Sequence, residues 1–105
     1  MAGMYSIKDL LALIDSEGAQ ELRLAPGSQP IMLLHGRPRP LAVSPLTGDN
    51  VAELLRSFAP PEQLKELHAC GDTHFIYQSE TTAKFSINAA MKGEEITVQI
   101  RNLRL

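Results

Sequence analysis

The sequence predicts an α+β fold in which about three helices lie on one side of a mainly antiparallel sheet. Two observations lead to this prediction: apolar residues recur at helical spacing in three segments, and in the other segments they alternate with period two. The expected order is a helix, two or three short strands, two helices and three longer strands. The chain has 105 residues, near the commonest size of one domain, so we expect residues 1–105 to fold as one unit.

The first helix is expected to begin at about Ile7. The Ser6 hydroxyl can cap it, and Asp9 lies in the first turn, where the helix dipole favours a carboxylate. Gly18 offers a C-terminal stop. An isolated helix this short would be marginal in water, so its apolar face must pack on something. That face consists of Ile7, Leu10, Leu11 and Ile14.

Two further helices are expected in the middle of the chain. One opens at Thr47, with Asn50 near its start, and the other opens at Pro61, because proline suits the first turn of a helix. Gly71 ends the later helix. The side chains expected to face inward are Val51, Leu54, Leu55 and Phe58 from the earlier helix, and Leu64 and Leu67 from the later one.

The segments expected to be strands form a short group and a long group. In the short group, Glu21–Leu24 alternates with one buried face, and Ile31–Leu34 is a continuous apolar run that fits a strand covered on both faces. We expect residues 36–40 to close that strand as a turn, because proline cannot donate to a ladder, and residues 41–43 to return as a short strand.

The long group is expected to be an antiparallel meander of three strands. The alternation is centred on Phe75 and Tyr77 in the first strand, runs from Phe85 to Met91 in the second, and marks the third with Ile96, Val98 and Ile100. The connections at residues 78–82 and 92–95 are short enough for antiparallel neighbours.

Composition and charge exclude several classes of function. Ten Lys and Arg against twelve Asp and Glu give a net charge of -2, without the basic excess that nucleic-acid binding requires. Cys70 is the one cysteine, so no intramolecular disulfide can form, which fits a reducing cytoplasm. Residues 1–6 lack the basic segment of a signal peptide, and no apolar run approaches the ~20 residues that span a bilayer. We expect a cytoplasmic domain with no nucleic-acid partner and no direct membrane insertion.

Catalytic motifs are absent from the sequence. It contains neither the G-x-x-x-x-G-K-[ST] loop that grips nucleotide phosphates nor a G-x-S-x-G nucleophile elbow, so we expect no enzymatic activity and no cofactor. Metal-capable side chains gather only in His68-x-Cys70-x-x-x-His74, where residues at i and i+2 of a helix point to different sides and no fourth ligand is evident. Surface histidines and a half-buried thiol are the simpler interpretation.

Two charged segments are open to two interpretations. Arg37 and Arg39 stand among prolines, where they form either a basic contact loop for a partner or a rigid turn with solvated charges. Glu94 and Glu95 form either a contact for a basic partner or a solvated hairpin tip.

Several segments of the sequence match the motifs of one protein family, in the same order along the chain. Residues 26–41 look like a PGSxPxxRxxGxxxPL segment, and residues 46–77 follow the spacing LTxxxVxxLLxSxxxxxQxxxLxxxGDxDFxY without a gap. Residues 85–89 resemble FRVNA, and residues 100–103 resemble FRxIP. Together these segments cover almost the whole chain. They resemble the N-terminal domain of the PilT/PilB/GspE-type motor ATPases of type IV pili and type II secretion, here without the ATP-hydrolysing domain.

The resemblance implies a PAS-like α+β domain that sits against the ATPase core of its own and a neighbouring subunit in a hexameric ring. In that family, strand arginines near the end of the domain reach toward the nucleotide at the subunit boundary, and Arg101 matches one of them. A second basic position falls on Glu94 in an ungapped alignment, and on Lys92 only if the loop is shifted. Other polar positions of the family pattern are replaced here by Leu33, His35 and His74.

Alternation also predicts where the Arg101 side chain points. With Ile96, Val98 and Ile100 on the core face, Arg101 must project from the opposite face, available to a partner. The alternative is a solvated strand arginine without a binding role. The candidate partner-binding residues are Arg101, Lys92, Arg37 and Arg39.

Three functions are compatible with these observations. The first is a non-catalytic adaptor or regulator that binds a motor ATPase or another component of a pilus, secretion or motility machine. The second is the N-terminal piece of a full hexameric motor ATPase. The third is a PAS-like sensor that holds a small ligand between sheet and helices, although the apolar lining offers few buried polar groups to orient one.

Overall fold

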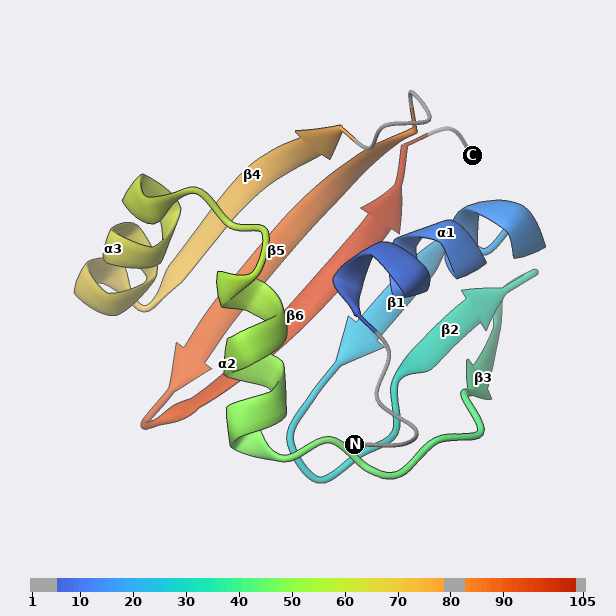
Figure 1. Cartoon of the computed structure of the whole chain (residues 1–105), viewed down its shortest axis with the longest axis horizontal. Coiled ribbons are helices and arrows are strands. Elements are labelled where there is room, and N and C mark those ends of the chain that lie inside the picture. The colour runs from blue at the N-terminus through green and yellow to red at the C-terminus, as the bar shows by residue number, and fades with distance from the viewer. Residues whose placement is uncertain (1–5, 79–82, 104–105) are drawn as a thin grey trace.

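The computed structural model describes residues 6–78 and 83–103, which form three helices and one sheet (Figure 1). These helices lie on one face of the sheet, and no described helix lies on the other, which we call the open face (Figure 1). The elements in chain order are α1 (Ile7–Glu17), β1 (Glu21–Leu24), β2 (Ile31–Leu34), β3 (Arg37–Pro40), α2 (Gly48–Arg56), α3 (Pro61–Cys70), β4 (Asp72–Gln78), β5 (Lys84–Lys92) and β6 (Glu95–Asn102).

The sheet has six strands in the order β3-β2-β1-β6-β5-β4, and every neighbouring pair is antiparallel. The α+β class and the meander of the last three strands are therefore confirmed. The connection predicted at residues 78–82 falls largely outside the described residues, as do residues 1–5 of the N-terminal segment. The pairing of β1 with β6 joins the two ends of the chain, and Leu22 lies opposite Ile100 in that register.

The predicted helix boundaries are confirmed by the caps. Ser6 and Asp9 form a reciprocal capping box at the start of α1, and Gly18 ends it in the left-handed region at φ 71°. Thr47 and Asn50 form the same box at α2. Helix α3 begins with Pro61, as predicted from the preference of proline for the first turn of a helix. Each boundary thus has a local chemical cause.

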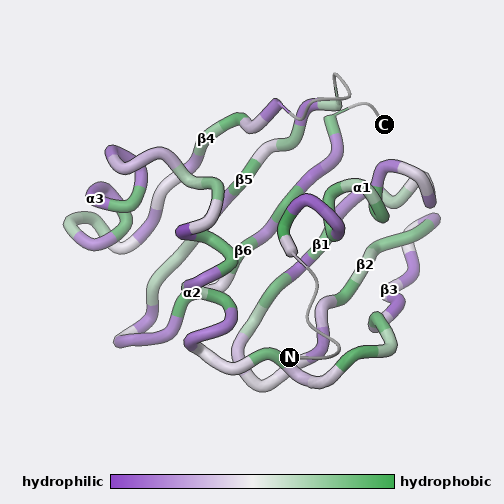
Figure 2. Tube along the Cα trace, in the orientation of Figure 1, coloured by the Kyte–Doolittle hydropathy of each residue, from purple (hydrophilic) through white to green (hydrophobic). Residues whose placement is uncertain are grey.

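The core lies between the helices and the covered face of the sheet. The apolar residues predicted for α1 and the residues Val51, Leu54 and Leu55 of α2 are buried in one cluster with alternate residues of the strands. Figure 2 shows hydrophobic positions along the helices and the strands. In α3 only Leu67 is fully buried. Phe58, predicted to belong to the second helix, lies just beyond its end at Arg56. Its ring packs on Phe75 and Tyr77, with ring centroids 5.7 and 5.2 Å away.

The hairpin of β2 and β3 contradicts one prediction. Residues 36–40 do not form a turn; Arg37–Pro40 is an edge strand, and the turn is His35–Gly36, with positive φ at both residues. The Leu41 N–H donates to the Pro30 carbonyl at 2.8 Å, so by alternation the nitrogens of Pro38 and Pro40 face away from β2. Proline is tolerated there because those positions have no hydrogen bond to lose.

Two further predictions about this region are wrong. Residues 41–43 form no strand, since Arg37–Pro40 is already the return strand. Strand β2 is not covered on both faces: Met32 is buried, while Ile31, Leu33 and Leu34 are partly exposed. A continuous apolar run cannot distinguish a doubly covered strand from one whose second face stays open.

Leu54→Ala is predicted to lower the free energy of unfolding by about 2–5 kcal/mol, because the Leu54 side chain is buried in the core and its removal leaves a cavity. The matched control is Glu53→Ala on the exposed side of the same helix. Chemical denaturation of both variants checks the prediction, and equal midpoint shifts would contradict the observed orientation of α2.

Candidate interaction site on the open face of the sheet

The open face carries a buried carboxylate at its centre. Glu21 begins β1, and its side chain is only 7% exposed although none of the described helices covers this side of the sheet. In the register, Leu33 of β2 lies on one side of it and Arg101 of β6 on the other. Neighbours within the sheet itself therefore bury this carboxylate.

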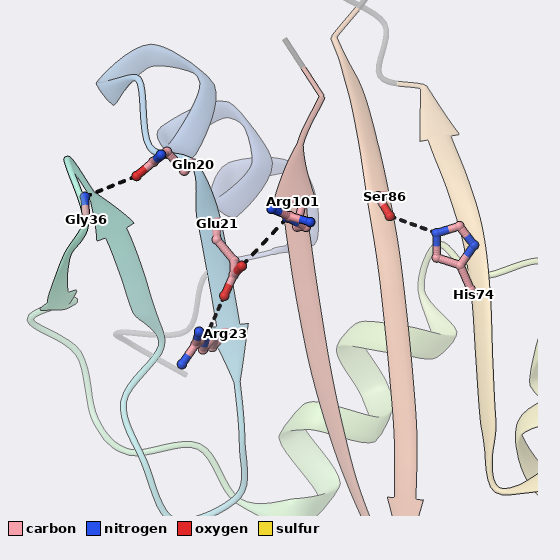
Figure 3. A network of polar contacts seen from close by, with 7 residues as sticks. All are labelled: Gln20, Glu21, Arg23, Gly36, His74, Ser86 and Arg101. Carbon is pink, nitrogen blue, oxygen red and sulfur yellow. Dashed lines mark hydrogen bonds and ion pairs between the residues drawn. The ribbon is translucent and has the colours of Figure 1, made fainter. Parts of the chain in front are cut away.

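Two arginines converge on the Glu21 carboxylate (Figure 3). The Arg23 Nε donates to Oε2 at 2.5 Å, and the Arg101 Nε lies 3.9 Å from Oε1. The side-chain amide of Gln99 also hydrogen-bonds to this carboxylate. We call these four residues, Glu21, Arg23, Gln99 and Arg101, the Glu21 network.

The network keeps Glu21 ionised. Burial alone would raise the pKa of Glu21, but the hydrogen bonds from Arg23 and Gln99, with the positive charges of Arg23 and Arg101, outweigh burial and lower it below 4.5. The buried, charged carboxylate of Glu21 is therefore compensated by its partners in the network.

The arginine head groups retain donors for another molecule. The side chains of Arg23 and Arg101 are 61% and 67% exposed, and both approach Glu21 through Nε. A guanidinium has five N–H donors in a planar fork, so the terminal nitrogens can meet an incoming carboxylate or phosphate. The Nε–Oε1 distance between Arg101 and Glu21 exceeds hydrogen-bond length, so this pair attracts through charge without a hydrogen bond.

A second polar contact lies beside the network on the same face. The ring Nε2 of His74, from β4, is 2.8 Å from the Ser86 hydroxyl of β5, and Ser86 lies opposite Arg101 in the register. A serine beside a histidine is the minimal pair for nucleophilic catalysis, but within residues 6–78 and 83–103 no carboxylate is recorded against the other ring nitrogen. The pair extends the polar surface around Arg101.

The four predicted partner-binding residues do not form one patch. Arg101 projects from the open face, as alternation predicts. Lys92 belongs to the same face but lies at the far end of the β5–β6 hairpin, opposite Glu95. Arg37 and Arg39 lie opposite Leu34 and Met32, so their side chains leave the other face of the sheet at its edge.

Sequence reasoning missed Glu21, Arg23 and Gln99. The alternation of β1 carries the available signal, since it places Glu21 and Arg23 opposite the buried Leu22 and Leu24. Their proximity to Arg101, however, depends on the pairing of strands from the two ends of the chain.

The metal-capable residues of the sequence are not brought together. In the part of the chain that the structure describes, no three His, Cys, Asp or Glu side chains are grouped to hold a metal ion. Cys70, whose thiol was expected to be half-buried, is exposed at the end of α3. None of the described helices is long and apolar enough to cross a membrane.

This architecture has the fold of the N-terminal domain of PilT-type motor ATPases. The crystal structure of the pilus retraction motor PilT with bound ADP superposes with a TM-score of 0.84 over 92% of this chain and 29% of that one, at 17% identity. The ATPase DotB of Legionella pneumophila superposes with a TM-score of 0.74 over 93% of this chain and 29% of its own, at 16% identity. At these identities the structural likeness establishes the fold.

The sequence comparison agrees with the structural one. The chain is 29% identical, over 83 residues, to the type IV pilus retraction ATPase PilT of Pseudomonas aeruginosa. That match covers 79% of this chain and 24% of the relative, so the chain spans about a quarter of the relative's length. No protein-family model matches the sequence. The predicted resemblance to the N-terminal domain of PilT-type ATPases is thereby confirmed.

Glu21→Gln is predicted to destabilise the fold at neutral pH by about 1–3 kcal/mol, since it removes a charge-assisted pair with Arg23. The folded-state pKa of Glu21 is lowered, so its stabilisation is full above 4.5 and is lost as pH falls through the folded value. The difference in thermal midpoint between wild type and variant should therefore be largest near pH 7 and shrink in acid.

The matched control is Glu53→Gln, an exposed glutamate on α2. Its thermal midpoint should follow the wild-type curve from pH 7 down into acid. A Glu21→Gln curve that stays parallel to wild type over the same range contradicts the role of the Glu21 charge.

Proposed function

We propose that this chain is a non-catalytic protein-interaction module of a pilus, secretion or motility machine, and that it docks on another component of that machine through the open face of its sheet. The Glu21 network is the observation that carries the proposal. It holds two exposed guanidinium groups beside one buried carboxylate, an arrangement suited to recognising an acidic group on a partner.

The chemistry of the face indicates what the partner presents. One carboxylate faces two guanidinium groups, so the network has a net positive charge within a chain whose formal charge is -2. Arg101 is the more available of the two, since its head group lies 3.9 Å from Glu21 while Arg23 is hydrogen-bonded. We infer that a carboxylate or phosphate of the partner, such as a motor ATPase subunit, pairs with Arg101.

A second candidate follows from the lengths of the aligned proteins. Because the chain spans 24% of the Pseudomonas aeruginosa PilT, it also fits the N-terminal domain of a larger motor ATPase. In that case the same face would dock on an ATPase domain of the same assembly. The reading frame beyond Leu105 distinguishes the two: a Walker A motif downstream supports the motor, and a stop codon supports the separate module.

The purified chain is predicted not to hydrolyse ATP, because it contains no phosphate loop and no residues set to hold Mg²⁺ for phosphoryl transfer. A phosphate-release assay with the homogeneous protein checks this. Turnover that co-purifies with the chain and changes with Arg101→Ala would contradict the proposal.

Arg101→Ala is predicted to abolish recruitment of the partner with little change in thermal midpoint, within about 0.5 kcal/mol of stability, because Arg23 still pairs with Glu21. Arg101→Lys should restore recruitment only in part, since lysine lacks the planar fork. Affinity capture from the native cell with identification of the bound proteins, alongside a melting curve, measures both effects.

Arg39→Ala is the matched control, because Arg39 is an exposed arginine whose side chain leaves the opposite side of the sheet. It should recruit the partner normally. Equal recruitment by Arg101→Ala and wild type removes Arg101 from the site, and capture of proteins unrelated to pili, secretion or motility argues against the proposed function.

A further inference from the structure

The two edges of the sheet differ in how they are protected from pairing. Strand β3 forms one edge, and Pro38 and Pro40 remove the N–H groups that would face a new strand. Strand β4 forms the other edge and contains no proline. Thus one edge is closed to strand addition and the other is not.

The backbone groups on the free side of β4 can be assigned from one hydrogen bond. The Met91 N–H donates to the Gly71 carbonyl at 2.8 Å, so by alternation the peptide groups of Thr73, Phe75 and Tyr77 face β5. Those of His74, Ile76 and Gln78 face outward. Among the described residues no strand lies beyond this edge, and α3 sits beside the start of β4 (Figure 1).

The side chains of this edge favour pairing rather than oppose it. From Thr73 to Gln78 the strand carries no Lys, Arg, Asp or Glu, the residues that usually blunt an edge. Ile76 is 52% exposed on the open face. On the helix side, Tyr77 is partly buried against Phe58 and presents the rim of an aromatic cluster.

We propose that β4 pairs antiparallel with β4 of a second copy of this chain, about a twofold axis at Ile76. In that register His74, Ile76 and Gln78 supply the outward N–H and C=O groups, with His74 of one copy opposite Gln78 of the other and Ile76 opposite itself. The two sheets become one continuous sheet with both sets of helices on the same side.

A second copy fits because the edge is complementary to itself on both faces. On the helix side the register sets Phe75 of one copy opposite Tyr77 of the other, in the non-hydrogen-bonded positions where side chains approach most closely. On the open face the two Ile76 side chains meet. The described segment that pairs, His74–Gln78, contains no Asp, Glu, Lys or Arg, so no like charges oppose each other within it. The α3 helices lie toward opposite ends of the new ladder.

Amide hydrogen exchange at rising protein concentration tests the pairing residue by residue. The amides of His74, Ile76 and Gln78 should exchange fast when dilute and become protected as the mass measured by sedimentation equilibrium rises to that of a dimer. The amides of Phe75 and Tyr77 are the internal control, because they are already bonded to β5 at every concentration. A chain that stays monomeric, or a dimer whose outward β4 amides remain unprotected, overturns the proposal.

Charge variants at the twofold axis test the register. Ile76→Lys and Ile76→Glu should each be monomeric, because like charges would face each other across the axis, and an equimolar mixture should form the dimer again. Ile76→Thr keeps a β-branched side chain and should still dimerise. Melting curves confirm that each variant is folded. A dimer in the Lys variant alone, or failure of the mixture to associate, rules out pairing at Ile76.

Discussion

The pairing of β1 with β6 holds the two halves of the sheet together. It joins a strand near the N-terminus to the last strand of the chain, with Leu22 opposite Ile100 and both fully buried. Without it, the hairpin of β2 and β3 would have no connection to the meander of β4, β5 and β6. Bringing β1 and β6 together closes a loop that contains most of the chain, which costs conformational entropy. The burial of apolar side chains on the covered face offsets that cost.

The same pairing builds the Glu21 network on the other side of the sheet. Because successive residues point to opposite faces, the register that buries Leu22 against Ile100 also sets Glu21 beside Arg101. Core packing and the surface arrangement are thus consequences of one alignment of two strands. A slip of one residue would exchange the two faces and expose the core side chains, so the register is strongly specified.

Elements that are set by contacts within a few residues could be predicted from the sequence. Features that depend on how strands pair in the sheet could not. Ser6, Thr47 and Gly18 mark helix ends through contacts within a few residues, and the alternation around Ile87 and Ile100 marks the long strands. The hairpin at His35–Gly36 was missed because its strand contains prolines, whose tolerance depends on which way each nitrogen faces.

The candidate site shows the same division. Alternation alone indicates that Arg101 projects from the open face, but its carboxylate partner, Glu21, lies in the first strand of the chain. Arg37 and Arg39 were grouped with Arg101 because all are basic, and the register assigns them to the opposite face. Charge can be read from a sequence, whereas the side of a sheet on which distant charges meet depends on its topology.

The two arginines of the network have different physical roles. Arg23 hydrogen-bonds to Glu21 at 2.5 Å and supplies the neutralising charge that a buried carboxylate requires. The Arg101 Nε stands 3.9 Å from the Glu21 carboxylate and adds attraction through charge, and the Arg101 side chain remains 67% exposed. Because the internal charge is already balanced by Arg23, pairing Arg101 with an outside anion leaves Glu21 compensated. A binding surface can therefore form on this sheet without weakening the strand pairing beneath it.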